Sequence, residues 1–322
     1  MSLESIKQPV SADLIAVDTV IRTHLASDVV LVNQVAEYII HSGGKRIRPL
    51  VAVLAGRACG QSGTVLANTA AIVEFIHTAT LLHDDVVDGS ELRRGRDTAN
   101  AVWGNEASVL VGDYLYSRAF EMMVELGSMR VMAVMAGATN KIAEGEVLQL
   151  MNAHDPDTTE ARYFEVIYRK TAKLFEAGAQ IAAIVAGAST AHEQALAQYG
   201  RHLGTAFQLV DDVLDYRASA EELGKNLGDD LAEGKPTLPL IHALKHGNPE
   251  QQQLIRHAIE NGGLDSIDDI TRIIESTGGL EYTARLARQE TELAIAALAT
   301  LPDSAHVTAL RELAEFAVSR SY

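Results

Sequence analysis

The chain of 322 residues contains a single cysteine, Cys59, and this scarcity excludes two classes of protein. One thiol cannot form an intramolecular disulfide or a zinc cluster of cysteines, so neither a disulfide scaffold nor a zinc module is expected. Cys59 lies among small apolar residues, which predicts a buried core thiol. These features predict a reducing compartment, and we expect the protein to be cytoplasmic.

Basic residues are also few relative to acidic ones, with 27 Lys and Arg against 43 Asp and Glu and a net charge of −16. Electrostatics therefore disfavours a nucleic-acid partner. The first ten residues carry Glu4, Lys7 and Pro9 where a signal peptide would be apolar. No run of about 18 purely apolar residues occurs. We expect neither secretion nor a membrane span.

The chain has seven prolines, and none falls between Pro49 and Pro156 or between Pro156 and Pro236. Because proline disrupts a helix interior, these intervals can hold long helices, and they are rich in helix-forming residues. The sequence shows no strand-like alternation, internal repeat or linker composition. It predicts an all-α fold in one domain, residues 1–322. The expected helices are 11–27, 29–41, 47–59, 65–88, 105–126, 129–152, 158–187, 191–217, 237–246, 250–261, 266–276, 280–299 and 304–320.

Two acidic signatures, DDVVD at 84–88 and DDVLD at 211–215, each end an apolar helical segment. Residues four apart on a helix share one face, so each signature projects a pair of carboxylates together. Such carboxylates repel one another unless a cation lies between them, and oxygen ligands suit Mg²⁺ shared with a substrate phosphate. One DDxxD is commonly a solvated helix end, but two copies predict a diphosphate gripped through magnesium. The candidate ligands are Asp84, Asp85, Asp88, Asp211, Asp212 and Asp215.

A basic cluster at 43–49, GGKRIRP, places three cations at a glycine turn before a helix. Such a helix start favours anions, although a solvated basic turn has the same composition. Arg93 and Arg94 directly follow the first acidic signature and add two cations. His77 precedes Asp84 by two helical turns and could donate to a phosphate, although a core histidine is the commoner role.

Together these motifs resemble the trans-isoprenyl diphosphate synthase family, and within it the long-chain polyprenyl branch. The resemblance spans most of the chain and keeps the family's order of motifs. It implies a helical bundle of the isoprenoid synthase type with a central active-site cavity, a Mg²⁺-dependent prenyltransferase and a homodimer. The matching motifs are GGKRIRP at 43–49, HTATLLHDDVVD at 77–88, RRG at 93–95, KT at 170–171, GTAFQLVDDVLD at 204–215, GKN at 224–226 and GKPT at 234–237.

The resemblance also divides the binding residues between two substrates. Magnesium and the cations would draw electrons from the allylic diphosphate, so that its C–O bond ionises. The double bond of isopentenyl diphosphate would then attack the allylic cation, and proton loss would leave a chain one isoprene unit longer. By resemblance, isopentenyl diphosphate contacts Lys45, Arg48, His77 and Arg94. The allylic substrate contacts Arg93, Lys225, Lys235 and the expected catalytic residues Lys170, Thr171 and Gln208.

The residues before Asp84 predict a long product. Ala79 and Thr80 lie about one helical turn before Asp84 and provide no aromatic ring to stop a growing chain. By resemblance to the long-chain branch we expect a product of about eight prenyl units. A bulky ring at these positions would fill the tunnel and stop the chain earlier. This product would be a quinone side-chain precursor and could bring the enzyme to a membrane surface. The expected tunnel continues along Ile76, Ile72, Tyr116, Ala119 and Met123, with ordinary core packing as the alternative for Met123.

Three alternatives remain open on the sequence. A farnesyl or geranylgeranyl synthase would make a shorter product, and a class I terpene cyclase would need no isopentenyl diphosphate. Lys45, Arg48 and Arg94 favour elongation over cyclisation. A non-catalytic partner subunit is disfavoured because both acidic signatures are intact.

Overall fold

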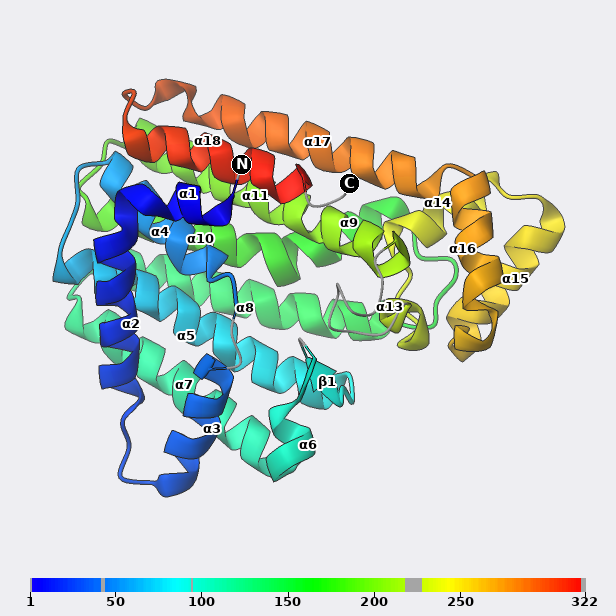
Figure 1. Cartoon of the computed structure of the whole chain (residues 1–322), viewed down its shortest axis with the longest axis horizontal. Helices are drawn as coiled ribbons and strands as arrows, with labels where there is room; N and C mark the ends of the chain where they lie inside the picture. The colour runs from blue at the N-terminus through cyan, green and yellow to red at the C-terminus, as the bar shows by residue number, and fades with distance from the viewer. Residues whose placement is uncertain (1, 42–43, 94, 218–227, 320–322) are drawn as a thin grey trace. The chain divides into compact units, whose positions relative to one another are not determined.

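The computed structural model describes residues 2–41, 44–93, 95–217 and 228–319 (Figure 1). The described chain forms two compact units. Unit 1 combines residues 1–139, 174–200 and 295–313, and unit 2 combines 140–173, 201–294 and 314–322. The expectation of a single domain over residues 1–322 stays a prediction.

Helices account for nearly all of the described secondary structure, as predicted. Up to residue 152 the elements are α1 (Leu3–Lys7), the 3-10 helix η1 (Gln8–Val10), α2 (Ser11–Leu25), α3 (Val30–His41), α4 (Ile47–Ala58), α5 (Thr64–Val87), β1 (Leu92–Arg93), β2 (Arg96–Asp97), α6 (Ala99–Trp103), α7 (Asn105–Glu125) and α8 (Met129–Asn152). The remaining elements are α9 (Glu160–Ile167), the π-helix η2 (Tyr168–Ala172), α10 (Lys173–Val185), α11 (Thr190–Arg217), α13 (Asp229–Ala232), α14 (Leu238–His246), α15 (Pro249–Asn261), η3 (Leu264–Ser266), α16 (Ile267–Ser276), α17 (Gly279–Ala297), η4 (Leu298–Thr300) and α18 (Ala305–Ser319).

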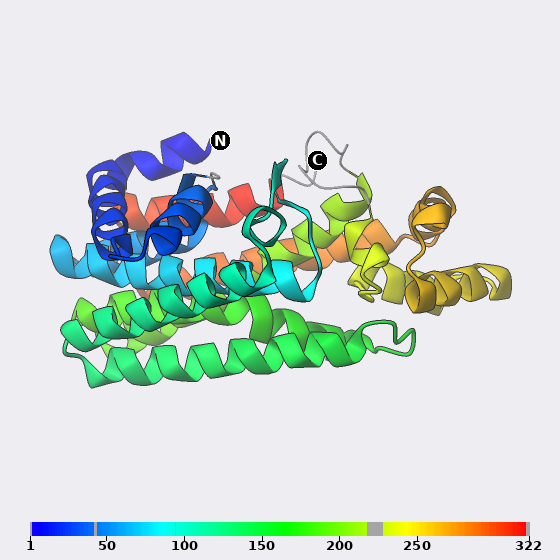
Figure 2. The same cartoon turned by 90° about the horizontal axis from the view of Figure 1, so that it is seen from below.

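Helix α5 forms the centre of unit 1. It begins after Gly63 and ends at Val87 with Asp88 as its C-cap. Gly89, which follows, takes a positive φ of 62° that a residue with a Cβ rarely adopts. Helices α2, α4 and α7 pack on α5, and α7 lies beside it (Figures 1 and 2). Most of α5 is therefore buried, including Ile72, Ile76 and Ala79.

Alone among the described helices, α5 is long and apolar enough to cross a membrane by length and composition. Its most apolar window of 18 residues has a mean hydropathy of 1.5, although that window includes Glu74 and several polar residues. Two-thirds of this window (67%) is buried inside the protein. Burial of this kind is the pattern of a core helix.

Unit 2 has its own apolar clusters. One cluster joins α14, α15 and α16 through residues such as Leu240, Ile259 and Ile274. The other surrounds Tyr163 of α9. Its further buried members are Ile167, Leu209, Val210, Leu238 and Ala287.

The structure corrects several details of the sequence analysis. The helix expected over 158–187 begins at Glu160 and contains a π-helical turn over Tyr168–Ala172. A two-stranded hairpin pairs Leu92 with Asp97 and Arg93 with Arg96, and strands of two residues are too short to show alternation. Helices α1, α6 and α13 were not predicted because each has only four or five residues. Cys59 is partly exposed at the end of α4, and the burial it does have raises its pKa.

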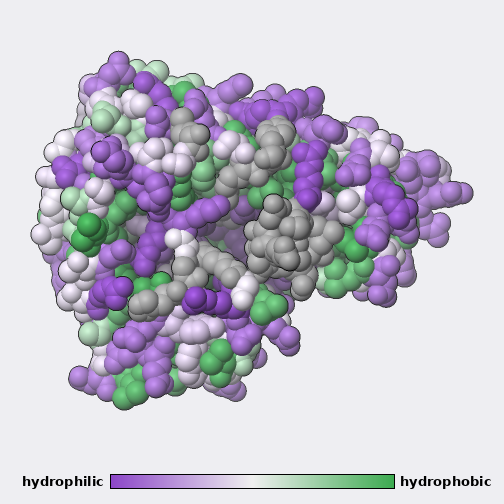
Figure 3. All heavy atoms as spheres, viewed as in Figure 1, coloured by the Kyte–Doolittle hydropathy of each residue, from purple (hydrophilic) through white to green (hydrophobic). Residues whose placement is uncertain are grey.

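The face of the molecule drawn in Figure 3 is mostly hydrophilic, with apolar residues in small separate patches. Exposed apolar residues of the described chain include Leu110, Val124, Met129, Val147 and Leu150.

Candidate active site

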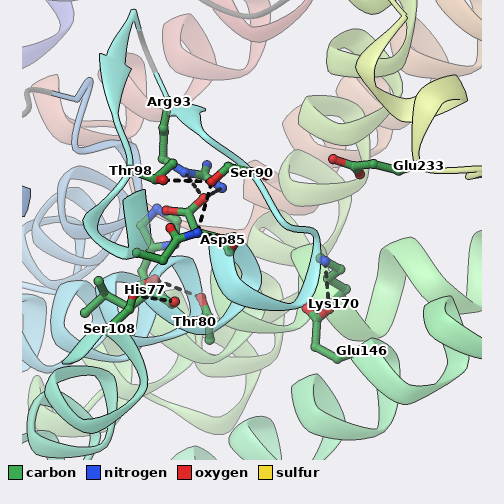
Figure 4. A network of polar contacts seen from close by, with 12 residues as sticks. His77, Thr80, Asp85, Ser90, Arg93, Thr98, Ser108, Glu146, Lys170 and Glu233 are labelled. Atoms are coloured by element: carbon green, nitrogen blue, oxygen red, sulfur yellow. Dashed lines mark hydrogen bonds and ion pairs between the residues drawn. The ribbon is translucent and has the colours of Figure 1, made fainter. Parts of the chain in front are cut away.

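The first acidic signature lies at the C-terminal end of α5, in unit 1. Asp84 and Asp88 are partly exposed, but Asp85 is buried with an exposed fraction of 2%. Asp85 Oδ1 accepts hydrogen bonds from Arg93 Nε at 2.8 Å and from Arg93 Nη2 at 2.7 Å (Figure 4). Neighbouring helix residues point about 100° apart, so Asp85 cannot share the face of Asp84 and Asp88. Through its two contacts with Arg93, Asp85 is paired with another predicted site residue.

The hairpin that carries Arg93 is tied at its base to the end of α5. Ser90 O accepts from Thr98 Oγ1 at 2.7 Å and from Asn100 Nδ2 at 3.1 Å. Ser90 N donates to Asp85 O at 2.9 Å, and Asn100 Nδ2 is 3.3 Å from the same oxygen. Thr98 and Asn100 were not predicted, because their roles depend on the loop closing back on α5.

The basic turn before α4 splits its cations between two tasks. Lys45 is exposed, whereas Arg46 forms an ion pair with Asp18 of α2 at 3.0 Å. Arg46 also has a φ of 48°, unusual for a residue with a side chain. Arg46, the one cation of this turn that the resemblance does not match to a substrate, thus pairs with a neighbouring helix.

Arg48 lies next to His77, as the expected phosphate site requires. Arg48 Nη1 is 3.0 Å from His77 Nε2, and the guanidinium stacks 4.6 Å from the ring centre of Phe175. Arginine can only donate, so His77 accepts at Nε2 and its Nδ1 carries the proton of the neutral ring. The structure thus unites two residues that lie 29 positions apart in sequence.

Apart from Tyr116, the positions expected to line a tunnel carry no aromatic ring, and most of them are buried. On α5, Ala79 is fully buried and Thr80 is partly exposed, with its hydroxyl donating to His77 O at 2.8 Å. On α7, Tyr116 is partly exposed and its ring lies 5.1 Å from that of Phe120. The buried remainder of the set consists of Ile72, Ile76, Ala119 and Met123.

The second acidic signature lies on α11, in unit 2. Asp211 is exposed and Asp215 is buried, while Asp212 has an exposed fraction of 1%. Both Asp212 carboxylate oxygens accept hydrogen bonds: Oδ2 from Tyr163 OH at 2.5 Å and Oδ1 from Gln208 Nε2 at 2.9 Å. As in the first signature, the second aspartate is buried and accepts hydrogen bonds from protein side chains.

The pKa of Asp212 is raised to about 8, mainly by burial and then by the negative charge of Asp230. The hydrogen bonds from Tyr163 and Gln208 lower the same pKa but do not offset burial. The pKa of Tyr163 also lies well above its usual value, mainly through burial and then through the charge of Asp212. Asp230, on the short helix α13, thus adds a further acidic group that the sequence analysis did not select.

The π-helical turn carries Lys170 and Thr171. Lys170 Nζ forms an ion pair with Glu146 Oε2 at 2.7 Å, seen in Figure 4, and Thr171 Oγ1 donates to Gln208 Oε1 at 2.9 Å. Gly145 of α8 faces the turn, where a Cβ would come within 2.8 Å of Lys170 N. A π turn is a frequent feature of functional sites, and here a glycine gives it room.

The remaining predicted site residues are Lys235, Arg94 and Lys225. Lys235 forms an ion pair with Glu233. Arg94 and Lys225 lie outside the described residues. Among the residues that the structure describes, no three His, Cys, Asp or Glu side chains converge closely enough to hold a metal ion by themselves.

Comparison with known proteins identifies the class. The family model described as Polyprenyl synthetase matches residues 29–277. The chain is 57% identical to octaprenyl diphosphate synthase of Escherichia coli (strain K12) over 321 residues, covering 99% of each chain. It is 55% identical to octaprenyl diphosphate synthase of Haemophilus influenzae over 323 residues, covering 100% of this chain and 98% of the relative. A crystal structure of polyprenyl synthase from Caulobacter crescentus CB15, complexed with calcium and isoprenyl diphosphate, matches with a TM-score of 0.96 and 46% identity, covering 100% of this chain and 98% of that one.

The chain therefore belongs to the polyprenyl synthetase family and is a prenyltransferase. Its full-length identity of 55–57% to the two octaprenyl diphosphate synthases places it among the long-chain polyprenyl synthases. The family resemblance, the all-α isoprenoid synthase fold and the enzyme class predicted from the sequence are confirmed.

Proposed function

We propose that this prenyltransferase condenses isopentenyl diphosphate repeatedly with an allylic prenyl diphosphate until the product holds about eight prenyl units. At that length the product fills the tunnel, and no further prenyl unit fits. The observation that carries the proposal is the 57% identity, over essentially the whole chain, to an octaprenyl diphosphate synthase. We further propose that the product supplies a quinone side chain.

The residues present fit a divalent metal. The candidate ligands are hard carboxylate oxygens. Besides burial, the negative charges of Asp230 and Asp211 raise the pKa of Asp212, and a cation would offset these charges. Mg²⁺ shared with substrate phosphates needs only one or two carboxylates from the protein. When bound, it would neutralise the leaving diphosphate. The acidic residues of the proposed metal site are Asp84, Asp85, Asp88, Asp211, Asp212 and Asp215.

Within this set, burial supports different roles. We assign direct metal contact to Asp84, Asp88 and Asp211, whose carboxylates are the more accessible. Asp85 keeps its hydrogen bond from Arg93, and Asp212 keeps its hydrogen bonds from Tyr163 and Gln208. Each of the two aspartates thereby fixes the position of its partners.

The chain's cations hold the two diphosphates, because arginine and lysine form charge-assisted hydrogen bonds with phosphate oxygens. Arg48 and His77, already in contact with each other, support a common phosphate site. Arg93 is oriented by Asp85, and Thr171 by Gln208. The proposed isopentenyl diphosphate residues are Lys45, Arg48, His77 and Arg94, and the proposed allylic residues are Arg93, Lys170, Thr171, Gln208, Lys225 and Lys235.

Holding the double bond of isopentenyl diphosphate beside the allylic carbon supplies much of the rate. Ionisation breaks the allylic C–O bond, and the π electrons of the double bond form the new C–C bond. A proton then leaves, and we propose that the departing pyrophosphate accepts it. Apolar walls such as Ala79 and Ile76 would keep water from the cation.

The product assay tests this function. Purified chain is supplied with Mg²⁺, farnesyl diphosphate and isopentenyl diphosphate, and the dephosphorylated products are separated by chromatography. We expect a main product of about eight units, limited by the tunnel. A product of three or four units would refute the assigned length. Conversion of farnesyl diphosphate without isopentenyl diphosphate would indicate cyclisation, and no magnesium-dependent turnover would indicate a non-catalytic subunit.

We also propose that the enzyme is a homodimer. Support comes from α8, where exposed residues follow the alternating three- and four-residue spacing of a helix-pairing seam. Leu150→Glu should then give a monomer in analytical ultracentrifugation, and an unchanged mass would exclude this face. The exposed α8 positions are Met129, Ala133 and Ala136 in unit 1, and Asn140, Ala143, Val147 and Leu150 in unit 2.

For location, we propose the cytoplasm, with the lipophilic product drawing the enzyme to a membrane surface. The single, partly exposed thiol of Cys59 supports a reducing compartment. The strongly acidic composition supports an aqueous one. Fractionation of cells that produce the protein would test this proposal.

A further inference from the structure

We propose that Tyr163 is a positioning residue for the allylic substrate, acting through Asp212 and Gln208. The inference rests on the proposed function, since it takes Gln208 and Thr171 as allylic contacts. Tyr163 is not itself one of the proposed substrate-binding residues. It lies on α9, two helical turns before Lys170.

The Tyr163 hydroxyl is fixed in place by its surroundings. Its ring lies in the apolar cluster with Ile167, Leu209 and Val210, and its exposed fraction is 5%. The ring of Phe164 meets it edge-on at 5.4 Å. From this position the hydroxyl donates to Asp212 Oδ2 at 2.5 Å, so one carboxylate oxygen is held at one point.

Fixing Asp212 determines the orientation of the Gln208 amide. The second carboxylate oxygen accepts from Gln208 Nε2 at 2.9 Å. While Asp212 is ionised, a flipped amide would place Gln208 Oε1 against a carboxylate oxygen, where neither atom can donate. The nitrogen of Gln208 therefore faces Asp212, and its oxygen faces Thr171.

The orientation of Gln208 in turn determines the orientation of Thr171. Gln208 Oε1 accepts from Thr171 Oγ1 at 2.9 Å, so the hydroxyl hydrogen of Thr171 points at Gln208. The oxygen lone pairs of Thr171 are then directed elsewhere. The chain Tyr163, Asp212, Gln208, Thr171 thus connects a buried phenol to two proposed substrate contacts.

The matched control is Tyr199, which also donates a buried hydroxyl hydrogen bond, to Leu310 O at 2.7 Å. Tyr163→Phe and Tyr199→Phe each delete one such hydroxyl and leave the ring. The partner of Tyr199 is a backbone carbonyl of α18 outside every proposed substrate contact. A merely structural role predicts the same kinetic consequence for both variants.

Steady-state titration of each substrate tests the proposal. We expect Tyr163→Phe to raise the KM for farnesyl diphosphate about tenfold or more, the scale of a lost hydrogen bond to a charged group. Its KM for isopentenyl diphosphate should stay within about twofold, a change far smaller than one hydrogen bond. Tyr199→Phe should leave both KM values unchanged. Equal farnesyl diphosphate KM values in the two variants would overturn the proposal.

A binding measurement gives a readout independent of turnover. Mg²⁺ with inorganic pyrophosphate should raise the melting temperature of the wild type and of Tyr199→Phe, and should raise that of Tyr163→Phe much less. Equal protection of both variants would count against the positioning role. A wild-type chain that is protected but makes no polyprenyl product would refute the proposed function while leaving this test intact.

Asp212→Asn provides a second variant should Tyr163→Phe fold poorly. An asparagine that accepts from Tyr163 through its oxygen turns its NH₂ group toward Gln208, so the Gln208 amide has to flip. The farnesyl diphosphate KM should then rise as in Tyr163→Phe. A wild-type KM for this variant would overturn the proposed chain of hydrogen bonds.

Discussion

Arg93→Ala should destabilise the protein because it leaves a buried carboxylate without its arginine. Asp85, with an exposed fraction of 2%, would lose donors at 2.7 and 2.8 Å. Removing one partner of a fully buried ion pair costs about 3–5 kcal/mol. The Arg93 side chain is 26% exposed, so water can replace part of what is lost. We therefore expect the free energy of unfolding to fall by about 2–3 kcal/mol.

A double-mutant cycle isolates this interaction from other effects of the substitutions. Denaturant unfolding of Arg93→Ala, Asp85→Ala and the double variant should give a coupling of about 1.5–3 kcal/mol. The exposed pair Arg311 and Asp303, with a separation of 3.3 Å, provides a matched control. Its cycle should give about 0–0.5 kcal/mol.

Equal coupling in the two cycles would refute the reasoning, because it would mean that burial adds nothing at Asp85. Substrate titration then connects stability to function. Arg93→Ala should raise the KM for the allylic substrate, and Arg93→Lys should recover only part of the loss because an ammonium lacks the guanidinium fork.

Three further predictions concern the other parts of the site. Ala79→Tyr should shorten the product to about three or four units, because a ring cannot enter a fully buried position without blocking the space beyond it; a long product from a folded variant would refute the tunnel. Asp84→Ala should lower turnover at limiting Mg²⁺ with little change in melting temperature, because removing one of several clustered carboxylates also relieves repulsion; full activity there would remove Asp84 from the metal set. Lys45→Ala and Arg48→Ala should each weaken isopentenyl diphosphate binding by about 1.5–3 kcal/mol, while equal losses for both substrates would show that the phosphate sites are wrongly divided.

Helix positions were the part of the fold most open to prediction, because proline spacing and helix-forming composition are local signals. The π turn at Lys170 was not predictable in this way. It depends on the close approach of Gly145, which is 25 positions away and on another helix. The hairpin carrying Arg93 likewise depends on Thr98 and Asn100 reaching back to Ser90.

The candidate site was predictable in its residue types but not in the roles within each signature. Identical letters in DDxxD do not reveal that Asp85 and Asp212 are buried while Asp84 and Asp211 are more accessible. Burial comes from partners distant in sequence, such as Tyr163, which is 49 positions from Asp212. No local pattern marks such a tyrosine.

The composition of α5 has a consequence for how the chain is made. Its window of mean hydropathy 1.5 is covered in part by α7, which begins at Asn105 and so follows α5 during synthesis. A nascent chain that ends near residue 95 contains α2 and α4 but not α7, so it presents the α7-facing side of this apolar helix to chaperones and lipid. Truncations placed between α5 and α7 should therefore aggregate or partition into membranes, although the complete chain buries the same segment.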